Sequence, residues 1–93
     1  MQLKPEETDL VGHWKIVNEK VVEDATSERI EYLINRQLEK VAGGGGETLY
    51  RDPADARYWE LTYPQGEMHG GGPPRLTNLP REEARTKYGD DLP

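Results

Sequence analysis

Residues 47–63 read ETLYRDPADARYWELTY and predict a β-hairpin. Two runs, Glu47–Arg51 and Arg57–Tyr63, have the aromatic and alternating character of strands. Between them, Asp52 in the first position and Pro53 in the second suit a type I turn. We therefore expect two antiparallel strands with a short connection, and a small sheet to which this hairpin belongs.

Side chains alternate between the two faces of the second predicted strand, because the side-chain period of a strand is two residues. One face carries Trp59, Leu61 and Tyr63, and the other carries Tyr58, Glu60 and Thr62. Since the first set is the more apolar, we expect it to be buried. The second set is then free to face water or a partner.

Residues 27–42 read SERIEYLINRQLEKVA and change to a helical period. The apolar residues recur at spacings of three and four, so that they share one face: Ile30, Leu33, Ile34, Leu38, Val41 and Ala42. Asp24, Thr26 or Ser27 can cap the N-terminus with a side-chain oxygen. Gly43 can take the left-handed conformation at the other end. The pattern predicts one long amphipathic helix, followed by a flexible linker over residues 43–46.

The segments on either side complete the expected element order. Before the helix, Gly12–Val17 reads as a strand, and Val21 with Val22 makes a short return strand after a turn at residues 18–20. After the hairpin, residues 64–74 are too rich in Gly and Pro for regular structure. Arg75–Leu79 reads as a last short strand. Pro80 then begins a short C-terminal helix with acidic residues first, basic residues next and Gly89 at its end.

This order predicts an α+β fold, with a small antiparallel β-sheet, one long helix packed on one face and a short C-terminal helix. At 93 residues, we expect residues 1–93 to form a single domain. The core between sheet and helix is expected to contain Trp14, Trp59, Ile30, Leu33, Ile34 and Leu38.

Composition narrows the possible functions. Cysteine is absent, which excludes disulfides, thiolate metal sites and a cysteine nucleophile, and fits a cytoplasmic protein. The net charge of −6 disfavours nucleic acid and anionic membranes as partners, because binding to either normally depends on Lys and Arg. A basic protein partner would instead be attracted. Nothing in the sequence indicates an oligomeric state.

A weak chemical motif lies in the Gly-rich loop, where Glu67 and His69 are two residues apart. They could act as a general base or as part of a metal site, but His13 would have to come close to complete a ligand set. One candidate function is therefore that of a small metal-dependent or His/Glu hydrolase. The structural alternative is that His69 bonds to backbone carbonyls. We expect no catalytic residues, no metal and no cofactor, and hence no enzyme.

An aromatic and acidic surface is the stronger candidate. Residues of the predicted hairpin and of the loop, mostly tyrosines and carboxylates, make up this candidate partner-binding set: Tyr50, Asp52, Asp55, Tyr58, Glu60, Glu67, Met68 and His69. Tyrosine offers a large rigid contact area, and carboxylates add charge complementarity. Alternatively, cross-strand tyrosines simply stabilise the sheet. The residues alone leave both interpretations open.

Two further segments are distinctive: residues 47–53 read ETLYRDP, and residues 57–74 read RYWELTYPQGEMHGGGPP, of which the run PQGEMHGGGPP is unusual in composition. Together with the start at residues 10–14, residues 29–31 and the ending at residues 82–89, they resemble the immunity protein 27 family of bacterial polymorphic toxin systems. The resemblance implies a cytoplasmic antidote that binds and neutralises a cognate toxin. It implies neither the identity of that toxin nor the residues that contact it.

Overall fold

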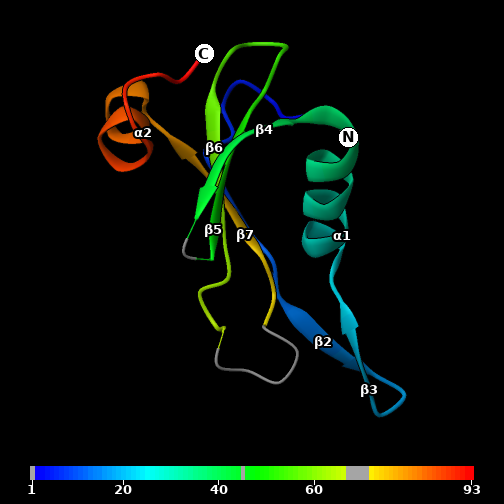
Figure 1. Ribbon diagram of the computed structural model, residues 1–93. Helices are drawn as coiled ribbons and strands as arrows, with labels where there is room; N and C mark the ends of the chain where they lie inside the picture. Colours follow the sequence, from blue (N-terminus) through cyan, green and yellow to red (C-terminus); the bar gives the residue numbers. More distant parts are fainter. Residues whose placement is uncertain (1, 45, 67–71) are drawn as a thin grey trace.

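The computed structural model describes residues 2–44, 46–66 and 72–93, and it places an antiparallel sheet between two helices. The elements are β1 (Asp9–Val11), β2 (Trp14–Val17), β3 (Lys20–Glu23), α1 (Ala25–Tyr32), η1 (Leu33–Gln37), β4 (Glu39–Gly44), β5 (Glu47–Arg51), β6 (Tyr58–Thr62), β7 (Arg75–Leu79) and α2 (Arg81–Tyr88). The main sheet has the order β1-β7-β6-β5-β4, whereas β2 and β3 form a separate hairpin. Figure 1 shows α1 and α2 on opposite sides of the sheet. The predicted α+β class is confirmed.

The hairpin expected from residues 47–63 is confirmed as β5 and β6. Tyr50 pairs with Trp59, and the Asp52 carboxylate accepts a hydrogen bond from the Ala54 N–H at 2.9 Å, which holds the turn. The last strand and the C-terminal helix also occur where the sequence predicts them. The helix α2 begins directly after Pro80. None of the helices in the described part of the chain is long and apolar enough to cross a membrane.

The predicted helix of residues 27–42 is wrong in its last five residues. Its start is confirmed, because the Asp24 carboxylate caps α1 by accepting a hydrogen bond from the Ser27 N–H at 2.7 Å. The helical backbone ends in η1, a π-helical turn closed by a bond of 2.8 Å from the Leu38 N–H to the Leu33 carbonyl. Leu38 itself is extended, and the chain continues as a strand.

Strand pairing explains why the helix stops early. The strand β4 pairs with β5 along the edge of the sheet, with a bulge at Val41 between Lys40 and Ala42. Val41 and Ala42 pack on the α2 side of the sheet, not on the side of α1. Long-range backbone pairing therefore overrides a helical spacing that was only local. Gly43 lies opposite Thr48 in this ladder, so its predicted roles as a helix cap and a linker residue are wrong.

The N-terminal part contains a strand that the sequence did not predict. Strand β1 pairs with β7, with Leu10 opposite Leu76, so the strand predicted from Gly12 begins only at Trp14. Gly12 marks the change of direction: its N–H donates to the Pro74 carbonyl at 2.8 Å. A Cβ on Gly12 would lie 2.7 Å from that same carbonyl oxygen. Only glycine allows this close approach of two backbones.

Two hydrophobic clusters cover the two faces of the sheet. The cluster beneath α1 contains Leu10, Ile30, Leu33, Leu38, Trp59, Leu61 and Leu76, and the cluster beneath α2 contains Leu49, Tyr58 and Ala84. Most of the predicted core is confirmed, with Ile34 only partly buried against the first cluster. Trp14 is an exception, because it is half-buried on the β2–β3 hairpin and outside both clusters. Tyr63, predicted to be buried with Trp59, is also exposed.

Candidate functional site

Three residues of the candidate partner-binding set are buried, so the expectation that they are exposed is wrong. Tyr58 retains 3% of its accessible surface, and Asp52 and Glu60 retain 8% each. Tyr58 and Glu60 alternate with Trp59 and Leu61 along β6, as predicted, but the face they occupy is covered by α2 and the C-terminal residues. Both faces of this strand are therefore buried.

The remaining members of the set are not brought together. Tyr50 pairs with Trp59 and therefore lies on the α1 face of the sheet, opposite to Tyr58. Asp55 is exposed in the β5–β6 turn and forms an ion pair with Arg57. The last three members, Glu67, Met68 and His69, lie outside the described residues. The described residues thus do not form the continuous acidic and aromatic surface that the sequence suggests.

Buried Glu60 is held by polar partners from α2. Its carboxylate accepts a hydrogen bond from the Tyr88 hydroxyl at 2.6 Å and lies 2.7 Å from the Lys87 ammonium. Burial raises the pKa of Glu60, but the hydrogen bonds from Lys87 and Tyr88 outweigh it, so the net shift is downward. Lys87 also pairs with Glu47. A carboxylate that stays ionised and fully partnered serves to hold α2 on the sheet.

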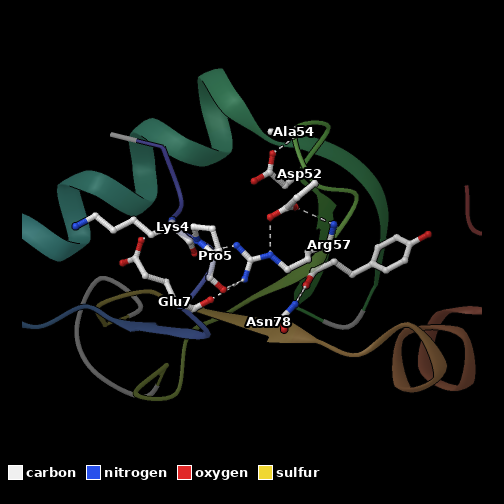
Figure 2. Close-up of polar contacts among 9 residues, drawn as sticks. Lys4, Pro5, Glu7, Asp52, Ala54, Arg57 and Asn78 are labelled. Atoms are coloured by element: carbon white, nitrogen blue, oxygen red, sulfur yellow. Dashed lines mark hydrogen bonds and ion pairs between the residues drawn. The ribbon is translucent and has the colours of Figure 1, made fainter.

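Arg57 plays a role that the sequence did not reveal. Its guanidinium donates to the backbone carbonyls of Glu7 at 2.7 Å and Lys4 at 3.0 Å, and its Nε donates to Asp55 at 2.7 Å. Figure 2 shows this side chain between the β5–β6 turn and the N-terminal segment. The guanidinium also lies 4.9 Å from the centre of the Trp59 ring. Its carbonyl partners lie about fifty positions away and have no sequence signature.

The residues proposed for hydrolysis do not form a site in the described structure. His13 is exposed at the base of the β2–β3 hairpin, where its backbone N–H and carbonyl bond to Asp24. Across residues 2–44, 46–66 and 72–93, no three His, Asp or Glu side chains are grouped to hold a metal ion. Glu67 and His69 belong to the segment that is not described. A test of whether His13 and His69 converge therefore lies outside the described residues.

An exposed apolar surface lies instead on the β2–β3 hairpin, which projects from one end of the molecule (Figure 1). Trp14 pairs with Glu23 and Ile16 with Val21, and because directly opposed residues share a face, Trp14, Ile16 and Val21 lie together. We call these three residues the Trp14 face. Ile16 is 77% exposed and Val21 62% exposed. Trp14, Val21, Val22 and Glu23 line a shallow hollow of about 390 Å³.

Acidic residues border the Trp14 face at the junction with α1. We call Glu23, Glu28 and Glu31 the acidic rim; Glu28 and Glu31 are exposed, and Glu23 is half-buried. A hydrogen bond with Glu31 raises the pKa of Glu23, and burial and repulsion from Glu28 add to the rise. Within the described residues, none of the three forms an ion pair with Lys or Arg. The rim is therefore a concentration of uncompensated negative charge.

The sequence carried a partial signal for this surface. Ile16, Val17, Val21 and Val22 are all β-branched, so both faces of the hairpin contain aliphatic residues. Such a pattern favours a strand buried on both sides. Only the fold shows that neither helix covers the tip of this hairpin.

Comparison with known proteins bears on what these surfaces do. The sequence model of the family described as immunity protein 27 matches residues 16–80, more than two thirds of the chain. The chain belongs to the immunity protein 27 family. No curated protein and no solved structure shows significant similarity to it.

The immunity protein 27 match includes the β5–β6 hairpin and, from Ile16 onward, the β2–β3 hairpin, whereas Trp14 lies outside the matched residues. It begins at Ile16 on the Trp14 face, continues through α1 and the acidic rim, and ends at Pro80. The helix α2 follows immediately, outside the matched residues, yet it covers the face of the sheet that carries Tyr58 and Glu60. For this immunity protein 27 chain, the burial of those two residues therefore depends on a segment that the family match does not include.

Proposed function

We propose that this chain is an immunity protein that neutralises a cognate bacterial toxin by direct protein–protein contact. The observation that supports this proposal is the family match over residues 16–80. The chain has a net charge of −6 and an uncompensated acidic rim. We therefore also propose that the partner has a basic surface. The chain acts in the cytoplasm as a binding protein and not as an enzyme.

The contact residues that we propose differ from the full predicted set. Asp52, Tyr58 and Glu60 are assigned to the stability of the turn and the α2 interface, because each is buried and bonded. Tyr50, Asp55, Glu67, Met68 and His69 stay proposed toxin contacts. No observation favours the hydrolase alternative, and it is not proposed.

Co-expression tests the function directly. The toxin domain encoded by the neighbouring gene should arrest bacterial growth when expressed alone, and this chain should restore growth. A toxin domain from an unrelated system is the matched control, and its toxicity should be unchanged. If the toxin arrests growth equally with and without the chain, or if no toxin is encoded nearby, the antidote proposal is wrong.

Titration separates binding from catalysis. If neutralisation is by direct contact, purified chain should abolish toxin activity at a stoichiometry of about one to one, and the two proteins should elute together in size-exclusion chromatography. An enzyme would instead protect at far lower ratios, because each molecule would act on many toxin molecules. Complete protection well below equimolar chain would therefore contradict direct contact.

A further inference from the structure

The Trp14 face belongs to neither hydrophobic cluster of the described chain. Ile16 and Val21 are mostly exposed, and two hydrogen bonds between His13 and Asp24 tie the hairpin to the start of α1 at its base. There the Asp24 N–H donates to the His13 carbonyl at 3.1 Å, and the His13 N–H donates to the Asp24 carboxylate, also at 3.1 Å. An isolated two-stranded hairpin is only marginally stable in water. Large aliphatic side chains at its exposed end therefore add little to the fold.

The two faces of the hairpin differ in charge as well as in polarity. The opposite face carries Lys15 and Lys20 around Val17, whereas the Trp14 face leads to the acidic rim. A hydrogen bond with Glu31, burial, and repulsion from Glu31 and Glu28 together raise the pKa of Glu23, so ionised Glu23 costs stability in the free protein near neutral pH. Features that cost stability and expose apolar surface are typical of binding sites.

We infer that the Trp14 face with its acidic rim is the main docking surface for the toxin. The matching partner surface is an apolar patch bordered by Lys or Arg. This inference rests on the proposed function and adds the location and the chemistry of the contact. A half-buried tryptophan flanked by aliphatic residues is a common composition for an interface centre, and carboxylates at the edge are typical of its rim.

A second copy of this chain would fit the Trp14 face and its acidic rim less well than a basic toxin would. Two copies would bring together two molecules that each carry a net charge of −6, and in a two-fold arrangement the same acidic patch is present on both sides. Like charges across an interface are repulsive. The charge pattern therefore favours a basic partner over self-association.

Substitutions on the two faces of the hairpin test the apolar contact. Ile16→Thr and Val21→Thr retain β-branching but remove apolar surface from the Trp14 face. Val17→Thr on the opposite face is the matched control. In surface plasmon resonance with an inactivated toxin domain from the neighbouring gene, the double variant I16T/V21T should bind roughly tenfold more weakly or worse through faster dissociation. V17T should bind as the wild type does.

Neutralising the acidic rim tests the electrostatic part. The variant E28Q/E31Q removes two charges beside the Trp14 face, and E82Q/E83Q removes two charges from the first turn of α2 on the other side of the sheet. E28Q/E31Q should slow association about tenfold at low salt and weaken its salt dependence, because steering depends on nearby charge. The control pair has the same net charge and should change the rate much less.

The outcomes separate this inference from the proposed function. Failure of the wild-type chain to bind the toxin domain would reject both. Wild-type binding with unchanged kinetics in I16T/V21T and E28Q/E31Q would retain the function but overturn the docking surface. Asp55→Lys should have a smaller effect than I16T/V21T, and the reverse order would place the main contact at the β5–β6 turn. Sedimentation of the free chain as a dimer that I16T/V21T dissociates would assign the Trp14 face to self-association.

Discussion

The two hairpins β5–β6 and β2–β3 have similar sequence signals and opposite surroundings. Each contains a tryptophan in a run of alternating residues. Trp59 of β6 is completely buried, and its neighbour Glu60 is almost completely buried, whereas Trp14 of β2 is half-buried and Ile16 beside it is exposed. The hairpin that the sequence suggested as a binding surface lies inside the fold. The other hairpin is the one that remains open.

The difference shows that alternation defines two faces but does not decide which elements cover them. The helix α1 covers one face of β5–β6, and α2 covers the other. The β2–β3 hairpin extends past the end of α1 (Figure 1), and Gly12 lies between β1 of the main sheet and β2 of this separate hairpin. Burial is therefore a property of how the elements pack, and equal substitutions in the two hairpins should have unequal costs.

The largest contrast is expected between the two tryptophans. Trp59→Ala should reduce the free energy of unfolding by about 3–5 kcal/mol, because it leaves a large cavity beneath α1. Trp14→Ala should cost less, about 1–2 kcal/mol, since this residue is only partly buried and lies outside both hydrophobic clusters. Urea unfolding followed by circular dichroism measures both. Equal costs would mean that Trp14 belongs to the core.

The next contrast compares aliphatic residues. Leu33 of η1 is fully buried in the cluster between α1 and the sheet, and Leu33→Ala should cost about 2–4 kcal/mol. Ile16→Ala should change stability by less than about 0.5 kcal/mol, because its side chain already lies in water. A cost near 2 kcal/mol for Ile16→Ala in denaturant unfolding would show that the Trp14 face is packed against this chain.

A smaller loss of stability is expected when the buried carboxylate of Glu60 is replaced. Glu60→Gln should destabilise the protein by about 1–3 kcal/mol, because it weakens the bonds to Lys87 and Tyr88 that hold α2. Glu82→Gln on the exposed side of α2 should stay within about 0.5 kcal/mol. Chemical denaturation of both variants gives the comparison. If the two were equal, Glu60 would not anchor the helix.

The smallest effect concerns pH and the Glu7–Arg29 pair. The hydrogen bond from Arg29 lowers the pKa of Glu7 from 4.5 to about 2. A lowered pKa stabilises the folded state above the unfolded value, and this contribution is lost as the pH falls from about 4.5 towards about 2. Glu7→Gln should thus cost about 1–2 kcal/mol near neutral pH and almost nothing near pH 2. A pH-independent cost in urea unfolding would contradict this assignment.

Interactions between residues close in sequence were sufficient to predict several elements of the fold. The Asp-Pro turn between β5 and β6, the Asp24 cap of α1 and the Pro80 and Gly89 limits of α2 all depend on neighbours within a few residues. Such signals are contained in a short segment of sequence, because turns and caps are satisfied by nearby backbone groups. The family resemblance was also present in the sequence, and the match over residues 16–80 confirms it.

Only the tertiary structure decided the rest, because the deciding contacts join distant segments. The strand β4 replaced the C-terminal end of a predicted helix by pairing with β5, and β1 appeared because β7 offered a partner more than sixty positions away. Tyr58 and Glu60 became structural when α2 packed over them. The Trp14 face became a candidate surface when no helix covered it. A side-chain pattern records that a face is apolar or polar, whereas long-range packing determines whether that face meets the core, water or another protein.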